Sequence, residues 1–188
     1  MNRNIESYVK VYNNWFAPQV CEDTIHELQT EHWQQHVFYN TATKSSAPVS
    51  GNKELDVCFG PISVTPYFVN RIWEGYKEYV LEFNFPWFRG WQSFSEPRFN
   101  RYKETRLMAS HCDHIHSMFD GERKGVPILS ALGVLNDGYE GGEFVMWEDT
   151  VIPLKGGDLM IFPSNFLYPH RVDPVTKGER YSVVTWAY

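Results

Sequence analysis

The pattern of hydrophobic and polar positions changes near residue 95 of this chain. Before that point, two stretches place apolar residues at the spacing of one helix face, which predicts helices over about 18–35 and 66–83. Each stretch begins at a proline, and Pro18 suits the first turn of a helix. Residues 41–52 between them are small and polar and contain Pro48 and Gly51, so we expect a loop there.

After residue 95 the pattern is that of short strands. Asp-Gly, Gly-Gly and Lys-Gly turn signals separate apolar or alternating runs at 98–108, 128–135, 142–147, 158–162 and 181–188. Short strands with such regular turns are typical of a β-sandwich, a jelly roll or a barrel. We therefore expect a mainly β chain of the α+β class, in which N-terminal helices support a C-terminal β-structure.

Composition and charge narrow the class of protein. The 188 residues, 43% hydrophobic and 16% aromatic, suit one domain with a sizeable core and exclude disorder as the main state. The net charge of −6 argues against nucleic-acid and anionic-membrane partners, and no apolar run is long enough to cross a bilayer. Three widely spaced cysteines and no apolar leader segment favour a cytoplasmic protein.

The densest candidate chemistry is the sequence SHCDHIHS at 110–117. Alternate residues of a strand share a face, so His111 and Asp113 can offer an imidazole and a carboxylate to one metal ion. The third ligand must come from elsewhere, and His170 in the β-rich half is the best candidate. The other histidines outside the cluster lie in the predicted N-terminal helical region: His26, His32 and His36.

Two histidines and one carboxylate with open coordination positions form the facial triad of non-haem Fe(II) oxygenases. Arg180 and Ser182 follow His170 and share a strand face. A guanidinium beside a hydroxyl suits a carboxylate, such as the far end of 2-oxoglutarate. His114 or His116 in place of His111 remains an alternative ligand.

A family resemblance rests on an ordered set of segments. RYKETRLMASHCDH, SALGVLND, YEGGEFVMW, GGDLMIFPSNFLYPHRV and ERYSVVTWAY resemble the prolyl 4-hydroxylase-like branch of the 2-oxoglutarate- and Fe(II)-dependent dioxygenases. The likeness is close over about 95–188 and loose before that. It implies a double-stranded β-helix, or cupin-like jelly roll, in a single domain over 1–188. Within that domain, residues 1–94 would be the helical support and 95–188 the core.

The resemblance also assigns roles to residues. It implies that His111, Asp113 and His170 are the catalytic iron ligands and that Arg180 pairs with the distal carboxylate of 2-oxoglutarate. Tyr102 would line the co-substrate pocket, and Trp186 would be an aromatic residue near the active site. At two positions where relatives carry tyrosine this chain has Met108 and Val134, and we expect Ser182 to supply the missing hydroxyl.

The implied activity is hydroxylation of an unactivated C–H bond, most simply in a prolyl residue of a peptide or protein, with release of succinate and CO₂. Its implied cofactors are Fe(II), 2-oxoglutarate and O₂, with ascorbate as a candidate reductant. The alternatives are an oxygenase acting on another residue or a small molecule, a cupin-type metal dioxygenase independent of 2-oxoglutarate, and a binding module that has lost its chemistry. The sequence leaves the oligomeric state open.

One further residue and two further segments each allow two interpretations. Cys112 is expected to be a buried, inert thiol rather than a redox-sensitive one. The polar, glycine-bearing stretch 118–127 has the character of a substrate lid. The aromatic-rich segment 83–94 is read as core, with an exposed patch for an extended peptide as the alternative.

Overall fold

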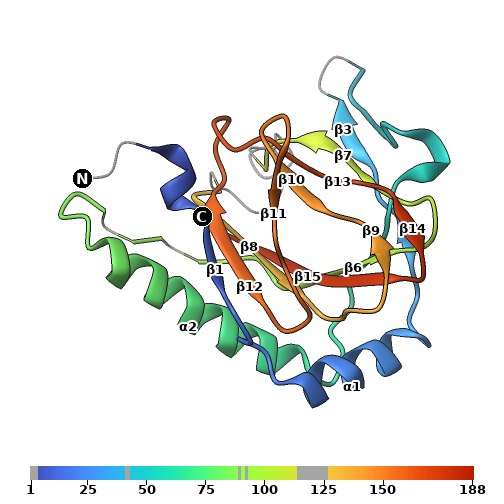
Figure 1. Cartoon of the computed structure of the whole chain (residues 1–188), viewed down its shortest axis with the longest axis horizontal. Coiled ribbons are helices and arrows are strands. Elements are labelled where there is room, and N and C mark those ends of the chain that lie inside the picture. Colours follow the sequence, from blue (N-terminus) through green and yellow to red (C-terminus); the bar gives the residue numbers. More distant parts are fainter. Residues whose placement is uncertain (1–3, 41–42, 89, 92, 114–126) are drawn as a thin grey trace.

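Antiparallel strands form the centre of the computed structural model, and the two α-helices found among the described residues lie along one side of them (Figure 1). The structure describes residues 4–40, 43–88, 90–91, 93–113 and 127–188. The helices are α1 (Pro18–Leu28) and α2 (Thr65–Phe83), with 3-10 turns at Ile5–Tyr8 and Gly51–Lys53. Among the described residues, no helix has both the length and the apolar character that a membrane span requires.

In the part of the chain that the structure describes, fifteen strands form two main sheets and two small ribbons. The seven-stranded sheet has the order β1-β12-β8-β15-β6-β5-β2, and the four-stranded sheet the order β11-β10-β13-β7. The ribbons are β14-β9 and β3-β4. The strand bounds are β1 (Lys10–Tyr12), β2 (Gln34–Gln35), β3 (Phe38–Asn40), β4 (Ser45–Ala47), β5 (Asp56–Cys58), β6 (Arg98–Tyr102), β7 (Met108–His111), β8 (Leu129–Val134), β9 (Glu140–Gly141), β10 (Phe144–Met146), β11 (Thr150–Ile152), β12 (Leu159–Pro163), β13 (His170–Val172), β14 (Val175–Lys177) and β15 (Arg180–Ala187).

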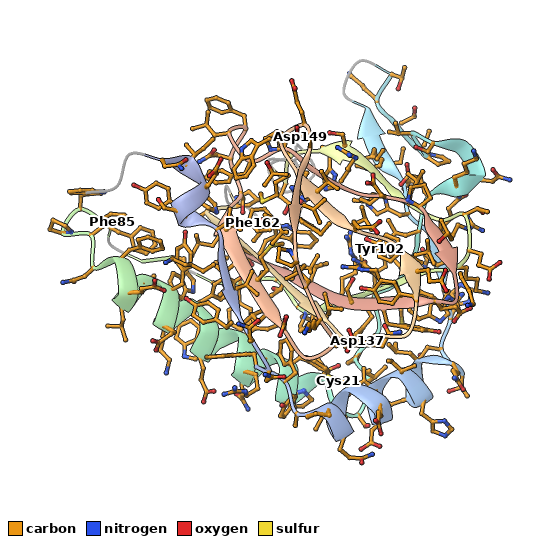
Figure 2. All side chains as sticks on the ribbon, viewed as in Figure 1. Cys21, Phe85, Tyr102, Asp137, Asp149 and Phe162 are labelled. Carbon is orange, nitrogen blue, oxygen red and sulfur yellow. The ribbon has the colours of Figure 1, made fainter. Side chains whose placement is uncertain are left out.

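The central strands of the large sheet are buried on both faces. Along β12, Leu159 and Ile161 join the core under the helices, whereas Met160 and Phe162 join the core between the sheets. Figure 2 shows Phe162 and Tyr102 inside the sandwich and Cys21 on the helical side. This double burial explains why these strands read as continuous apolar runs rather than as alternating ones.

The predicted mainly β jelly roll with supporting helices is confirmed, and most deviations concern where elements end. The first helix ends at Leu28 rather than near residue 35, because the chain turns there and Gln34–Gln35 pairs with β5. The run 98–108 is two strands, since a turn with Thr105 at φ 70° separates β6 from β7. The predicted loop 41–52 contains β4 and a 3-10 turn in its described part.

Candidate active site

The structure brings His111, Asp113 and His170 together. His111 ends β7, His170 begins β13, and the two residues are paired directly across these neighbouring strands. Asp113 follows β7 and places its Oδ1 3.3 Å from His111 Nε2 and 3.7 Å from His170 Nε2. The ligand atoms of all three residues lie within 4.8 Å of one another, a spacing that one metal ion can bridge.

Backbone carbonyls orient both imidazoles. His111 Nδ1 lies 2.8 Å from the Ala109 carbonyl oxygen, and His170 Nδ1 lies 3.1 Å from that of Tyr168. A carbonyl only accepts hydrogen bonds, so each Nδ1 carries a proton, and in the neutral form of each imidazole Nε2 is the nitrogen with a lone pair. Burial lowers the pKa of His170 to about 4, which keeps this imidazole neutral at ordinary pH. Both Nε2 atoms are therefore prepared to ligate a metal.

Asp113 is held as a carboxylate. Its side chain is buried, and the Ser130 hydroxyl donates to Oδ2 at 2.6 Å. Burial by itself would raise the pKa of Asp113, but His170, His111 and Ser130 together hold it well below its usual range. Ser164 Oγ lies 2.7 Å from Ser130 Oγ and extends this support. Two imidazoles and one ionised carboxylate are a donor set that fits Fe(II).

Aromatic rings pack around the two imidazoles. Phe144 stacks on His170 with ring centroids 5.1 Å apart, and Phe162 meets the same imidazole edge-on at 5.1 Å. Phe38 meets His111 edge-on at 5.5 Å. These contacts fix the ring planes and make one wall of the site apolar, which limits the access of water.

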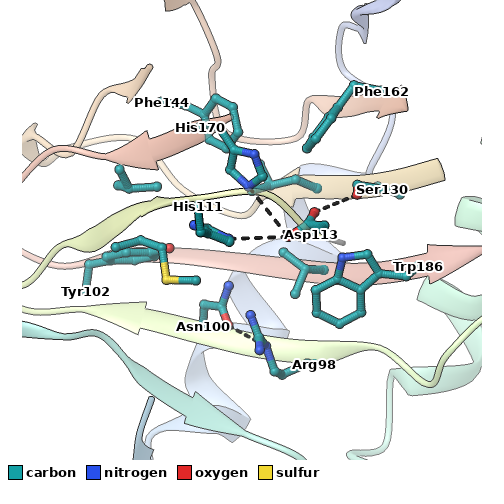
Figure 3. A pocket seen from close by; sticks show the side chains of 15 residues that line it. Arg98, Asn100, Tyr102, His111, Asp113, Ser130, Phe144, Phe162, His170 and Trp186 are labelled. Carbon is teal, nitrogen blue, oxygen red and sulfur yellow. Dashed lines mark hydrogen bonds and ion pairs between the residues drawn. The ribbon is translucent and has the colours of Figure 1, made fainter. Parts of the chain in front are cut away.

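A narrow cavity of about 30 Å³ adjoins the three residues (Figure 3), space for about two water molecules. Tyr102 and Trp186, two of the predicted co-substrate residues, line it. So does Met108, one of the departures from the family pattern. The complete lining is Arg98, Asn100, Tyr102, Met108, His111, Asp113, Ser130, Ala131, Leu132, Phe144, Phe162, His170, Val172, Val184 and Trp186.

Arg180 lies next to this cavity rather than in its lining. It is 1% exposed, with its guanidinium 5.1 Å from the centroid of the Tyr102 ring and 6.0 Å from that of Tyr139. Ser182 Oγ lies 3.5 Å from Arg180 Nη1, and Arg180 Nε has no hydrogen-bond partner among the described residues. Arg180 lines a second cavity of about 180 Å³, and Phe144 lies between the two cavities as a wall of both.

Sequence reasoning missed three polar residues at the site. Arg98 and Asn100 line the 30 Å³ cavity beside the three candidate ligands, called the metal cavity below, from the same face of β6 as Tyr102. The alternation of residues 98, 100 and 102 is the signal that would have found them. His36, assigned to the region of the first helix, is instead buried beside Phe38, and burial followed by the charges of Arg98 and His111 lowers its pKa to about 3.

Several other predictions have mixed outcomes. His114, His116 and residues 118–126 of the expected lid lie outside the described residues. The expected burial of Cys112 is wrong: its side chain is partly exposed, with Sγ 3.7 Å from the Phe166 carbonyl oxygen. Burial nevertheless raises the pKa of this thiol, which disfavours the reactive thiolate.

The segment 83–94 contains both core aromatic residues and exposed ones, the two alternatives that the sequence allowed. Trp91 and Phe94 pack against the side of α2 that carries Trp73 and Tyr76, as core residues do. Trp87 is 61% exposed and stacks on Phe85. Figure 2 shows Phe85 beyond the C-terminal end of α2. An apolar groove of about 380 Å³ lies there, between α2 and the strand ends at Leu129 and Pro163.

Comparison with known proteins places this geometry in a family. Residues 97–188 match the model of the 2OG-Fe(II) oxygenase superfamily. A PKHD-type hydroxylase of Idiomarina loihiensis is 36% identical over 90 residues, which are 46% of this chain and 39% of that protein. A PKHD-type hydroxylase of Shewanella oneidensis is 41% identical over 99 residues, 50% of this chain and 42% of that protein. The chain thus spans about two fifths of the length of these curated relatives.

Solved structures share the fold over almost the whole chain. A viral collagen prolyl hydroxylase from Paramecium Bursaria Chlorella virus-1, in its 2OG complex, has a TM-score of 0.68 at 15% identity, covering 96% of this chain and 94% of that one. A Trichoplax adhaerens prolyl hydroxylase, in complex with a hypoxia inducible factor peptide, also reaches 0.68 at 15% identity, covering 96% and 83%. The C-terminal half of the chain, residues 97–188, thus matches the 2OG-Fe(II) oxygenase superfamily, and almost the whole chain has a fold like that of prolyl hydroxylases.

Proposed function

We propose that this chain is an Fe(II)- and 2-oxoglutarate-dependent dioxygenase that hydroxylates an unactivated C–H bond. The observation that carries the proposal is the set of two imidazoles and one carboxylate whose ligand atoms lie within 4.8 Å of one another. We assign the metal to His111, Asp113 and His170. When bound, the iron would supply the oxidative chemistry, in which O₂ and 2-oxoglutarate yield hydroxylated product, succinate and CO₂.

The protein's own contribution is to orient its ligands and exclude water. The Ala109 and Tyr168 carbonyls hold the imidazoles with Nε2 toward the metal position, and Ser130 holds the Asp113 carboxylate. Phe144 and Phe162 provide the apolar wall. Apart from Tyr168, which directly precedes β13, these supports come from strands of the jelly roll, whose packing fixes the site before any ligand arrives.

We assign the distal carboxylate of 2-oxoglutarate to Arg180. Its guanidinium is buried, and its Nε lacks a partner among the described residues, so a carboxylate would satisfy both the charge and the open donor. Tyr102 packs against the guanidinium from the opposite strand position, and Ser182 adds a hydroxyl on the same strand face. Trp186, four residues further along the strand, contributes a wall of the metal cavity.

A prolyl residue of a peptide or protein is the substrate that we propose. The support is the fold shared with a viral collagen prolyl hydroxylase and with a prolyl hydroxylase in complex with a peptide. Ascorbate would act as the reductant that keeps the iron ferrous. We also propose that residues 1–188 form one domain, since β1, β2 and β5 of the N-terminal half complete the large sheet.

An anaerobic titration tests the metal and co-substrate assignment. Fe(II) and 2-oxoglutarate added together should produce a weak visible charge-transfer band in the wild-type chain. Asp113→Ala and His170→Ala should each weaken Fe(II) binding more than about a hundredfold and abolish the band. Mutating a residue that only hydrogen-bonds to a metal ligand already weakens metal binding by about 10–100-fold, and removing the ligand itself should cost more. His32→Ala, which removes an exposed histidine, is the matched control and should keep the band.

Two results would contradict the proposal. A band that persists in Asp113→Ala would show that this carboxylate is not a ligand. Iron binding without any response to 2-oxoglutarate would favour a cupin-type dioxygenase. If the band forms, succinate release should then increase on addition of prolyl peptides, and unchanged release with every such peptide would refute the prolyl substrate.

A further inference from the structure

Arg98 presents a guanidinium to the metal cavity from the first residue of β6. Strand alternation puts Arg98, Asn100 and Tyr102 on the inner face, opposite Val184, Ser182 and Arg180 of β15 respectively. Figure 3 shows Arg98 and Asn100 on the side of the cavity away from Phe144 and Phe162, with Trp186 beside them. Arg98 is the one lysine or arginine among the described residues that line this cavity.

The surroundings hold this guanidinium in place without neutralising it. Its Nε donates to Asn100 Oδ1 at 3.1 Å, and its Cζ lies over the Trp186 ring, 5.0 Å from the ring centroid. Three other arginines form ion pairs: Arg71 with Glu74, Arg101 with Asp56, and Arg171 with Asp173. Within the described part of the chain, no carboxylate pairs with Arg98.

Leaving this charge unpaired is costly. Burial lowers the pKa of Arg98, against the opposing effects of Tyr102 and Asp113. A guanidinium nevertheless stays protonated in proteins, so the site carries a fixed positive charge. A partly buried charge without a counterion destabilises the site unless a ligand supplies one.

Charge balance at the proposed site indicates what that ligand is. The metal's two positive charges and those of Arg98 and Arg180 face the one negative charge of Asp113 and the two of 2-oxoglutarate. One positive charge therefore remains when metal and co-substrate are bound. Arg180 already serves the co-substrate in the proposed function, which leaves Arg98 for a third component of the reaction, the substrate.

We propose that Arg98 binds a carboxylate of the substrate, so that the hydroxylated compound is an acid whose carboxylate lies near the reacting carbon. This inference rests on the proposed function and specifies its substrate. An arginine fork matches a carboxylate with two parallel hydrogen bonds, and Asn100 with Trp186 preorganises that fork. The carboxylate can belong to an acidic side chain or the C-terminus of a peptide, or to a free amino acid.

Matched acid and amide probes test the proposal. The wild-type chain, loaded anaerobically with Fe(II) and 2-oxoglutarate, is titrated with three pairs, and the shift of the visible band gives each Kd. The pairs are acetyl-Gly-Pro-Asp-amide with its Asn analogue, acetyl-Gly-Pro with its C-terminal amide, and free L-proline with L-prolinamide. In at least one pair the acid should bind about tenfold more tightly or better. The pair that responds identifies where the carboxylate lies.

Substitutions connect the preference to Arg98. Arg98→Met should remove the acid preference and leave the Kd of 2-oxoglutarate within about twofold, while Arg98→Lys should keep part of the preference. Arg101→Met is the matched control, because Arg101 lies on the opposite face of β6 and pairs with Asp56, and it should keep the full preference.

The outcomes separate this inference from the proposed function. Equal affinity for acid and amide in every pair, with a normal band in the wild type, overturns the role of Arg98 alone. An Arg98→Met variant that keeps the acid preference, or that loses 2-oxoglutarate instead, also overturns it. Absence of the band in the wild type overturns both proposals. The wild-type comparison needs no variant, so it decides the question even if Arg98→Met fails to fold.

Discussion

Arg98 and Arg180 share one face of the β6–β15 pair and yet have different surroundings. Arg180 lies opposite Tyr102 and Arg98 lies opposite Val184, four residues further along, which is about 13 Å at the rise of a strand. Arg180 is 1% exposed and enclosed by two tyrosines, whereas Arg98 is partly exposed and stacks on one side of Trp186. One end of the inner face is thus closed and the other is more open.

The difference in exposure between the two arginines suits two kinds of ligand. Backbone closely approaches Arg180: a Cβ at Gly142, which has φ 69°, would meet Arg180 Cδ at 3.2 Å. Such a tight environment suits one small acid that is the same in every turnover. The more open environment of Arg98 suits a group carried by a larger molecule. The comparison therefore supports the two proposals, which give 2-oxoglutarate to Arg180 at the closed end and substrate to Arg98 at the open end.

The largest expected effect is that of Arg180→Met on 2-oxoglutarate. Loss of a bidentate, charge-assisted contact should weaken 2-oxoglutarate binding about a hundredfold, while Arg98→Met should change 2-oxoglutarate binding less than about twofold. Titration of the anaerobic band with 2-oxoglutarate measures both. Equal losses in the two variants would break the comparison, because they would show that both arginines serve the same ligand.

Acid should destabilise the metal-free chain through its buried histidines. Burial lowers the pKa of His170 to about 4 and that of His36 to about 3, whereas unfolded histidines titrate near 6.5. Between these values the unfolded chain binds more protons. The free energy of unfolding should therefore decrease as the pH falls from about 6.5 toward 4, by on the order of 2 kcal/mol for each histidine.

The two arginines should affect this acid sensitivity differently. The charge of Arg98 contributes to the low pKa of His36, against an opposing effect of Asp113. Arg98→Met should therefore make stability less dependent on pH, whereas Arg180→Met should leave the dependence unchanged. Denaturant unfolding at pH 7.5 and pH 5 checks both variants. If the pH dependence of Arg98→Met matches that of the wild type, Arg98 and His36 are not coupled.

The smallest expected effect belongs to Ser182. Its hydroxyl is 3.5 Å from Arg180 Nη1, a long contact, so Ser182→Ala should weaken 2-oxoglutarate binding only about threefold. The same anaerobic titration measures this. A loss as large as that of Arg180→Met would mean that Ser182 contacts the co-substrate directly. Two side chains, and not Arg180 alone, would then bind 2-oxoglutarate at the closed end.

Sequence reasoning was strongest where the signal is local. His111 and Asp113 are separated by one residue, and the apolar runs that became β8, β12 and β15 are long enough to recognise. His170 required only that the β-rich half contain one further histidine. These features depend on neighbours in the chain, so the pattern alone predicts where they lie.

Sequence reasoning was weakest where tertiary pairing decides the structure. Strand β2 has two residues and exists because Gln34–Gln35 pairs with β5, which carries the chain away from the expected helix. His36 is buried because its backbone N–H donates to the Leu55 carbonyl oxygen at 2.8 Å, a contact between distant segments. Likewise Arg98 faces the cavity because of the register in which β6 pairs with β15. These strands are far apart in the chain, so no short stretch of sequence predicts that register.

The short strands at the margins of the large sheet have a consequence for how the chain can be divided. β1 covers the outer side of β12, and β5 with β2 covers the outer side of β6. A fragment limited to residues 97–188, the span of the family match, would lose both coverings. Two rows of unpaired backbone amides and carbonyls would then be free to recruit other chains, so we expect that fragment to aggregate rather than fold as a smaller enzyme.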